Sequence, residues 1–282
     1  MKSNHFTLLT SALLLSTSPA FATAVVLKDD AKKTITLESE LVFYGGDSVT
    51  FGPAAIEEIQ RLWNEAAAKL KFGDSEYGVQ IKIESRYITE QQACDEARTN
   101  ASFRTNYVRV ENSPAVARSF YLLKGNAGFF ETSRDKIGTS TTSAHEYGHG
   151  LGLDHPATGV KMLGVPHIMW PRGTWVEAQY QYSPTAVSGQ FGSTLNPAYR
   201  KVSPQEVETI GLDKLTFTQV LADMSQSQVG RTRPQNIIYD KKGIAFRCDV
   251  AFPRLVLTPT DQKPQGPVET TESSSLPHEV VE

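Results

Sequence analysis

The sequence of 282 residues lacks several features, and each absence argues against a class of protein. It has no excess of one charge, because 28 Lys and Arg stand against 31 Asp and Glu and leave a net charge of −3. A protein that binds nucleic acid through bulk electrostatics needs a strongly positive balance, so we expect no nucleic-acid partner. The sequence also has no internal repeats, and no apolar run is long enough to span a bilayer.

Histidine is scarce as well, with six residues in the whole chain. What is present argues for a folded protein: 39% of the residues are hydrophobic and 9% are aromatic, which excludes a wholly disordered chain. The length allows one large domain or two small ones and is enough to bury a sizeable core.

The first 22 residues have the pattern of a signal peptide. Lys2 supplies a positive charge, residues 8–15 are largely apolar, and Ala20-Phe21-Ala22 places small residues where a signal peptidase cleaves. The alternative, a buried N-terminal helix, would need a polar face that this stretch lacks. No Cys follows the expected cleavage site, so we expect no lipid anchor there. We predict a mature chain that begins near Thr23 and is secreted or periplasmic, with no membrane span.

The last residues, 259–282, are mostly Pro, Glu, Thr and Ser. Such a segment cannot bury enough apolar surface to offset its ordering entropy, so we predict a disordered acidic tail. A solvated segment and a docking segment are both compatible with this composition, and we favour the first. Without Lys2 and this tail the positive and negative residues are equal in number, so the folded body is predicted to be neutral.

Local patterns predict a sheet with one packing helix in the first half of the chain. Residues 34–44 are rich in β-branched and aromatic residues and predict a strand that ends at Gly45-Gly46-Asp47. Apolar residues at helical spacing predict a long helix that opens at Pro53 and continues to Leu70. Further strands are predicted at 78–88, 106–110, 118–123 and 128–132. The order is typical of a mixed sheet with a helix on it.

The second half contains one strong helix signal. Residues 204–214 begin with Pro204, Ser203 is a candidate N-cap, and Glu206 completes a capping box. Residues 171–202 are rich in Gly, Pro, Ser, Gln and Tyr and predict an irregular surface loop. Cys94 and Cys248, the only cysteines, could pair in an oxidising compartment or remain two independent buried thiols.

The candidate metal-binding and catalytic residues lie in the segment His145–His155. It reads H-E-x-x-H-x-x-G-x-x-H. On a helix His145 and His149 lie one turn apart on the same face and can share one zinc ion, with Glu146 near enough to reach a metal-bound water. Gly152 can adopt a positive φ, end the helix and bring His155 back as a third ligand. Three neutral His ligands leave one zinc position open, as in catalytic sites.

The helix that carries this motif should begin near residues 138–140, where Thr139 and Ser140 offer capping hydroxyl groups. Thr141, Thr142 and Ser143 are weak helix formers. We therefore expect burial rather than intrinsic propensity to hold the helix.

The motif resembles the zinc signature of the metzincin metallopeptidases. Metzincins also have a methionine turn that forms an apolar floor under the zinc ligands, and Met169 in Pro166-His167-Ile168-Met169-Trp170-Pro171 matches it. An ordinary core methionine is the alternative. The order of the predicted elements is also similar, over about residues 34–215. The resemblance implies one catalytic Zn²⁺ held by the three histidines.

The closest subfamily by this resemblance is matrixin-like, because the domain is compact and ends in a capped helix. Pro156 directly after the third histidine is more similar to the serralysins. The serralysin calcium repeats and the matrixin Cys-containing propeptide motif are both absent from the sequence. Calcium is compatible with the resemblance, but we find no convincing calcium loop. Tyr44-Gly45-Gly46-Asp47 weakly resembles the segment that caps the zinc in astacins, and a plain turn is the simpler interpretation.

The predicted fold class is α+β: a metzincin-like catalytic domain with a mixed twisted sheet, a packing helix, a zinc-binding helix and a small irregular C-terminal subdomain. We divide the chain into a signal peptide (1–22), an N-terminal subdomain with the sheet and zinc helix (23–152), a C-terminal subdomain with the Met-turn and final helix (153–215), an extension (216–258) and the tail (259–282).

The predicted function is a secreted zinc metalloendopeptidase that acts as a monomer on proteins or peptides, with Glu146 as general base. The substrate should lie extended beside an edge strand in 118–132, which contains two candidates. Tyr180, Tyr182 and His167 could contact it, although packed or loop roles are simpler. The alternatives are a catalytically weak protein-binding module, which would have no use for Glu146, and a zinc hydrolase of a non-peptide amide.

Overall fold

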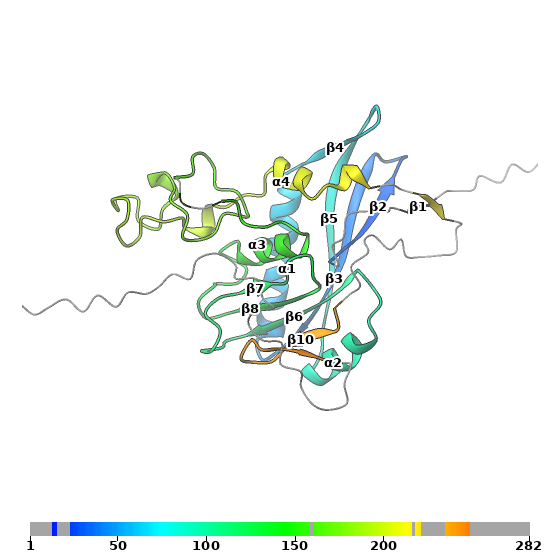
Figure 1. The fold of residues 1–282 in the computed structure, drawn as a ribbon, viewed down its shortest axis with the longest axis horizontal. Helices are drawn as coiled ribbons and strands as arrows, with labels where there is room; N and C mark the ends of the chain where they lie inside the picture. Colours follow the sequence, from blue (N-terminus) through cyan, green and yellow to red (C-terminus); the bar gives the residue numbers. More distant parts are fainter. Residues whose placement is uncertain are drawn as a thin grey trace, which may run out of the picture.

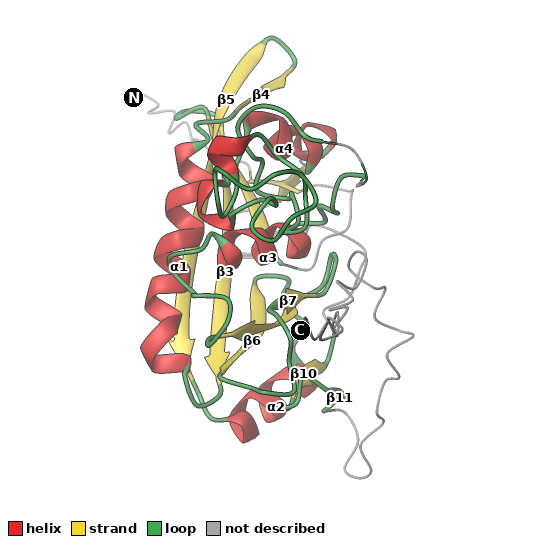
Figure 2. Cartoon of the chain, turned by 90° about the vertical axis from the view of Figure 1, so that its left-hand side faces the viewer, coloured by secondary structure: helices red, strands yellow, loops and turns green. Residues whose placement is uncertain are grey.

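The computed structural model has an α+β fold built on a curled, mixed seven-stranded sheet (Figures 1 and 2). It describes residues 13–15, 23–157, 159, 161–215, 218–220 and 235–248. The predicted signal peptide, apart from 13–15, and the predicted tail lie outside the described residues. The strands of the sheet are β2 (Val25–Asp29), β3 (Thr34–Tyr44), β4 (Lys69–Phe72), β5 (Ser75–Tyr87), β6 (Thr105–Glu111), β7 (Phe120–Tyr121) and β8 (Ala127–Glu131).

Strand β3 organises this sheet. The strand order is β4-β5-β3-β6-β8-β7, with β3 parallel to β5 and β6, β6 parallel to β8, and β7 antiparallel to β8. β5 pairs with one edge of β3. On the other edge, β2 pairs with the first half of β3 and β6 pairs with the second half of β3. The strand predicted at 34–44 is confirmed, and the four other predicted strands differ from β5, β6, β7 and β8 only at their ends.

Helix α1 (Ser48–Glu65) covers one face of the sheet and buries Ile59, Leu62 and Trp63. The prediction that this helix opens at Pro53 is wrong, because it begins five residues earlier and Pro53 lies inside it. A proline there leaves only the carbonyl of Val49 without its helical donor, and Val49 is 71% exposed, so water can serve that carbonyl. The helix also ends before the predicted Leu70, which belongs to β4.

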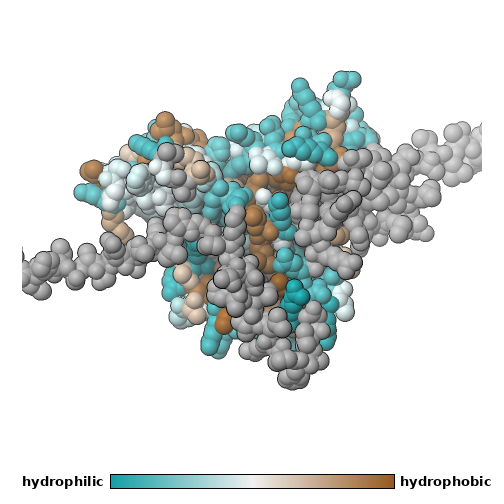
Figure 3. Space-filling model, viewed as in Figure 1, coloured by the Kyte–Doolittle hydropathy of each residue, from teal (hydrophilic) through white to brown (hydrophobic). Residues whose placement is uncertain are grey.

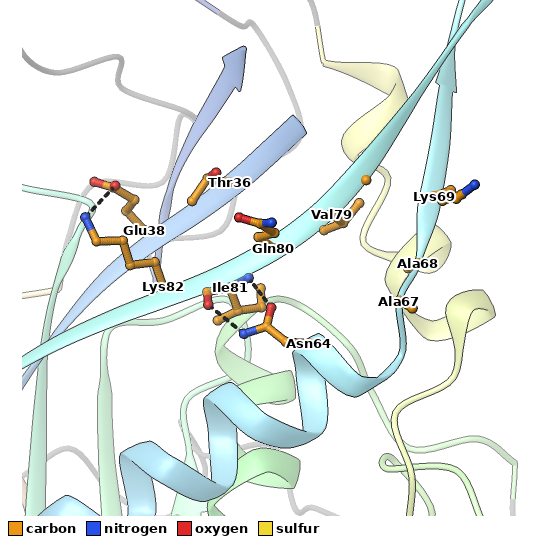
Figure 4. Close-up of a pocket in the computed structure, with 11 residues that line it drawn as sticks. Thr36, Glu38, Asn64, Ala67, Ala68, Lys69, Val79, Gln80, Ile81 and Lys82 are labelled. Carbon is orange, nitrogen blue, oxygen red and sulfur yellow. Dashed lines mark hydrogen bonds and ion pairs between the residues drawn. The ribbon is translucent and has the colours of Figure 1, made fainter. Parts of the chain in front are cut away.

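The end of α1 is fixed to β5 by one amide side chain. Asn64 donates from Nδ2 to the carbonyl of Ile81 at 3.0 Å and accepts from the Ile81 backbone N–H at 2.8 Å. Ala67 then takes a positive φ of 45°, which breaks the helix. Figure 4 shows these two hydrogen bonds beside a hollow lined by residues of α1, β3, β4 and β5. None of the predicted site residues lines that hollow.

Helix α2 (Glu90–Thr99) was not predicted. Its capping box is Thr89 with Gln92, and its only buried side chains are Ala93 and Ala97. A polar helix that buries two alanines gives no apolar periodicity, so the sequence pattern carried no signal for it.

The extension after residue 215 contributes a hairpin of β10 (Ile237–Tyr239) and β11 (Ala245–Arg247). This hairpin packs on α2, β6 and β8, and the hydroxyl of Tyr44 accepts from the Tyr239 backbone N–H at 2.7 Å. A disulfide joins Cys94 in α2 to Cys248 just after β11, with the Cα atoms 5.2 Å apart. A second short pair joins β1 (Leu13–Leu15) to β9 (Thr218–Val220).

The remaining elements lie in the second half of the chain. They are α3 (Thr142–Gly150), α4 (Pro204–Thr209) and the 3-10 turns η1 (Ala178–Tyr180), η2 (Pro197–Tyr199) and η3 (Leu212–Lys214). The capping box of Ser203 and Glu206 is confirmed, but the helix predicted at 204–214 ends at Thr209, and Gly211 with a φ of 78° separates it from η3. Within the described residues no helix is long and apolar enough to cross a membrane.

The predicted loop 171–202 is irregular apart from η1, η2 and isolated bridges such as Trp175 with Thr194. Several large apolar side chains on residues 163–199 are exposed, and apolar surface is visible over this loop at the upper left of Figure 3. They are Leu163, Val165, Trp175, Tyr182, Val187, Phe191 and Tyr199.

Candidate metal centre

Every residue of helix α3 is buried, including His145, Glu146 and His149. The predicted hydroxyl cap at its start is wrong. The N-cap residue is Thr141, with a φ of 62° and no capping bond from its side chain. The carboxylate of Glu58 on α1 takes that place, because Oε2 accepts from the Thr141 N–H and Oε1 from the Ala144 N–H, each at 3.2 Å. A carboxylate at a helix N-terminus satisfies free N–H groups and complements the helix dipole.

Two further contacts hold α3 against the core. The indole Nε1 of Trp63 donates to the carbonyl of Ala144 at 3.1 Å. The hydroxyl groups of Tyr147 and Ser39 are hydrogen-bonded at 2.8 Å, which links the helix to β3. Tertiary contacts therefore hold a helix whose first residues are weak helix formers, as expected.

Gly152 ends α3 as predicted. Its φ is +93°, its N–H donates to the carbonyl of His149 at 2.9 Å, and the Leu153 N–H donates to the carbonyl of Gly148 at 3.0 Å. The Lys124 N–H, from the turn after β7, also donates to the carbonyl of His149 at 2.9 Å. These bonds satisfy the end of the helix and turn the chain back towards it.

This turn brings His155 onto the two helical histidines. Its Nε2 lies 3.0 Å from Nε2 of His145, and one ligand nitrogen from each of His145, His149 and His155 lies within 4.8 Å of the others. The ring centroids are 4.7 to 5.0 Å apart. The three histidines could therefore hold a metal ion. Within the described part of the chain they are the only group of three or more His, Cys, Asp or Glu residues whose ligand atoms lie close enough for this.

Backbone carbonyls orient two of these rings. Nδ1 of His145 donates to the carbonyl of Ile168 at 2.6 Å, and Nδ1 of His149 donates to the carbonyl of Leu153 at 2.8 Å. A carbonyl can only accept, so both protons sit on Nδ1 and each Nε2 carries a lone pair. Nε2 of His149 is buried with no hydrogen-bond partner. A metal ion fits this arrangement, because it would satisfy these nitrogens.

Burial sets the charge state of the cluster. Desolvation lowers the pKa of His149 to about 4 and that of His155 to about 3, and it holds the pKa of His145 well below its usual value. The neighbouring imidazoles and the positive charge of Arg200 act in the same direction on His145 and His155. All three rings are therefore neutral near pH 7, which is the form that binds metal.

Glu146 follows the first ligand and is equally buried. Desolvation first, and then the negative charge of Asp135, raises the pKa of its carboxyl to about 8, while Arg118, Arg200 and Arg172 act in the opposite direction. Its Oε2 is buried without a hydrogen-bond partner.

The Met169 side chain is buried directly against α3. A Cβ placed on Gly148 would lie 2.5 Å from the Met169 sulfur and 3.3 Å from the Trp63 ring. Glu206 holds this turn, because its Oε1 accepts from the Met169 N–H at 2.9 Å while its Oε2 accepts from the Ser203 N–H at 2.9 Å. The capping-box glutamate thus has a second role that the sequence pattern did not indicate.

The other candidate contact residues make separate contacts of their own. His167 stacks on Trp170 with the centroids 5.2 Å apart and is not part of the three-histidine cluster. Tyr180 packs edge-on against Tyr199, and Tyr182 is half exposed and acts electrostatically on Arg200. Comparison with known protein families and with curated proteins found no match to this chain.

Proposed function

We propose that the chain is a zinc-dependent metalloendopeptidase of the metzincin type. The observation that carries the proposal is the convergence of three neutral imidazoles on one point, with the Glu146 carboxylate on the adjacent residue of the same helix. Three histidines with an open fourth position are typical of catalytic zinc rather than structural zinc. Met169, packed under Gly148, is consistent with the methionine turn of that clan.

His145, His149 and His155 would hold the ion, which supplies Lewis-acid polarisation of a water molecule and of the scissile carbonyl. Glu146 is the general base, which accepts the proton of the attacking water and returns it to the leaving amine. Its Oε2 is buried without a hydrogen-bond partner, and the base is the ionised form of a carboxyl whose pKa burial raises to about 8, a form that a cation on the histidines would favour.

The extended substrate lies along β7. The sequence predicts two candidate strands within residues 118–132, which correspond to β7 and β8. β8 is paired on both edges, by β6 and β7, whereas β7 ends the strand order within the described residues. An edge strand offers free backbone donors and acceptors to an added peptide strand. The turn after β7 bonds to the last turn of α3, so a peptide on this edge passes near the histidines.

We further propose an exported monomer that acts on proteins or peptides. Purified mature chain should cleave labelled casein in the presence of zinc, lose this activity with a chelator and regain it when zinc is returned. Glu146→Gln should retain one zinc per chain by elemental analysis and lose cleavage by about 10²–10⁴-fold. Glu208→Gln, at an exposed position on α4, is the matched control and should be unaffected.

The outcomes separate the alternatives. If zinc-loaded wild type cleaves no peptide in a broad library, the proposal is wrong, and a protein-binding module or a hydrolase of another amide takes its place. If Glu146→Gln cleaves as fast as wild type, the assignment of the base is wrong. His149→Ala should lose both zinc and cleavage.

A further inference from the structure

Strand β7 lies between helix α3 on one side and the hairpin of β10 and β11 on the other (Figures 1 and 2). Its two residues point to opposite faces of the sheet, as the alternation of a strand requires. Tyr121 faces α3, since a Cβ added to Gly150 would lie 2.9 Å from its ring. Phe120 faces the hairpin, and its ring lies edge-on against the Tyr239 ring with the centroids 4.8 Å apart. The proposed substrate strand therefore contacts both elements.

The sheet alone holds β7 weakly. Phe120 pairs with Phe129 and Tyr121 pairs with Gly128, and within the described residues β7 pairs with no strand other than β8. A strand this short at a sheet edge gains little from backbone hydrogen bonds, so its position depends on the side chains that pack on it. The rings of Phe120 and Phe129 stack with their centroids 5.8 Å apart, and Tyr239 belongs to the same apolar cluster.

The chain that leads into β7 also rests on the hairpin. The hydroxyl of Ser113 donates to the carbonyl of Lys241 at 2.6 Å. A Cβ added to Gly243, in the turn of the hairpin, would lie 2.8 Å from Cγ2 of Val116 and 3.7 Å from the Phe120 ring. The hairpin thus supports both β7 and the residues before it.

The hairpin is itself fixed to the rest of the fold. The N–H of Tyr239 donates to the Tyr44 hydroxyl of β3 at 2.7 Å, and Nη1 of Arg109 in β6 donates to the Tyr239 carbonyl at 3.2 Å. The disulfide between Cys94 and Cys248 joins the end of the hairpin to α2. A two-stranded hairpin alone is at best marginally stable, so these links are what make it a firm support.

The aromatic ring is the part of Tyr239 that acts on β7. The side chain is fully buried, and its hydroxyl has no hydrogen-bond partner. A buried hydroxyl without a partner adds no stability over a phenyl group, whereas an edge-on pair of rings stabilises beyond the area that it buries. Phenylalanine should therefore serve as well as tyrosine at this position, and an aliphatic residue should not.

We propose that the hairpin of β10 and β11 supports the substrate strand, and that Tyr239 is a positioning residue that acts through Phe120. This inference rests on the proposed peptidase function, and it gives the extension after residue 215 a role. A peptide that pairs with β7 binds more tightly when that strand is already in place, because less ordering is needed on binding. Two of the candidate ligand rings are oriented by the carbonyls of Ile168 and Leu153 instead, so the hairpin acts on peptide binding and not on the metal.

The test compares Tyr239→Leu with Tyr239→Phe in zinc-loaded mature protein, on one peptide long enough to lie along β7. Tyr239→Leu should raise KM by about fivefold or more, keep kcat within about threefold of wild type and keep one zinc per chain by elemental analysis. Tyr239→Phe should have the wild-type KM. Phe72→Leu is the matched control, because it removes a similar edge-on contact, with Tyr77 at 5.4 Å, at the opposite end of the strand order. It should leave KM unchanged.

Hydrogen exchange followed by mass spectrometry gives a second readout that needs no turnover. In Tyr239→Leu the backbone amides of residues 116–123 should exchange faster than in wild type, because β7 opens more often. The amides of residues 142–150 in α3 should exchange at the wild-type rate. A general loss of stability would instead raise exchange in both segments.

The outcomes separate this inference from the proposed function. An unchanged KM in Tyr239→Leu overturns the inference, and so does an equal rise in Tyr239→Phe, because the hydroxyl would then be the active part. Loss of zinc in Tyr239→Leu also overturns it, since the hairpin would then support the metal centre. If Tyr239→Leu does not fold, the chain with Cys94→Ser and Cys248→Ser decides: release of the hairpin from α2 should raise KM with zinc retained, and an unchanged KM overturns the inference. If wild type cleaves no peptide, the proposed function fails, and the exchange of residues 116–123 alone decides whether the hairpin holds β7.

Discussion

Gly148 offers a sharp test of how α3 is packed. In an open helix, replacing an interior glycine by alanine stabilises the fold by about 0.5–1 kcal/mol, because alanine loses less backbone entropy. At Gly148 the new Cβ would lie 2.5 Å from the sulfur of Met169 and 3.3 Å from the Trp63 ring. Overpacking of a filled core costs about 1–3 kcal/mol. The cost of the steric clash should therefore exceed the gain in backbone entropy, and Gly148→Ala should lower the unfolding free energy by about 1 kcal/mol.

The sign should reverse when Met169 is shortened. Met169→Ala alone should cost about 2–5 kcal/mol through the lost burial and the cavity. In that background the contact with the sulfur is gone and only the Trp63 ring at 3.3 Å remains, so Gly148→Ala should stabilise the chain by up to about 0.5–1 kcal/mol. The double-mutant cycle then gives a coupling energy of about 1–3 kcal/mol between the two positions.

The assay is urea unfolding of the four chains with a chelator present, so that metal affinity does not contribute to stability. Gly78→Ala in β5 is the matched control, because no heavy atom lies within 4 Å of its added Cβ. It should be neutral or slightly stabilising. The packing of Met169 under α3 is refuted if Gly148→Ala stabilises the wild-type background as much as the Met169→Ala background.

Three further changes have expected outcomes. Glu58→Ala leaves two buried N–H groups of α3 unpaired and should lower the unfolding free energy by about 2–5 kcal/mol. Because burial raises the pKa of Glu58, the folded chain holds its proton more tightly than the unfolded one, and wild type should lose stability relative to Glu58→Gln as pH rises above the ordinary glutamate pKa. Replacing Cys94 and Cys248 by Ser removes a link across 154 residues and should cost about 2–5 kcal/mol in urea unfolding without changing the zinc content. Gly152→Ala forces a φ of +93° on a residue with a Cβ, which costs about 1–2 kcal/mol, and it should weaken zinc binding in a chelator competition.

Controls or contrary results test these changes. Glu57→Ala, exposed beside Glu58, should change stability by less than about 0.5 kcal/mol, and equal effects at both positions would contradict the capping role. Gly164→Ala has a similar φ of +83° in an exposed loop and should leave zinc affinity unchanged. Loss of zinc in the Cys94→Ser and Cys248→Ser chain would mean that the hairpin supports the metal centre.

The parts of the fold that could be predicted from the sequence are those in which the signal is local. Alternation over Thr34–Tyr44 gave β3, and the capping pair of Ser203 with Glu206 gave the start of α4. The turn at Gly152 followed from the freedom of glycine to adopt a positive φ. In each case the residues that determine the conformation lie within a few positions of one another.

The wrong predictions concern positions whose conformation depends on residues that are distant in the sequence. Pro53 looked like a first helical residue, but contacts of α1 with the sheet extend the helix past it. The cap of α3 was sought in Thr139 and Ser140, and Glu58 supplies it from 83 positions earlier. No spacing rule connects these positions, because the sheet and α1 bring them together only in the folded chain.

The arrangement of charges around Glu146 could not be predicted from the sequence either. Counted along the sequence, the folded body has as many positive as negative residues, which fits the absence of a nucleic-acid partner that we expect. In space, Arg118, Arg172 and Arg200 all act on Glu146, and Asp135 is already bound by one of them. A neutral total therefore does not imply a neutral site, since the interaction between charges falls with distance and depends on burial. The count that argues against a nucleic-acid partner therefore says nothing of how charge is arranged around Glu146.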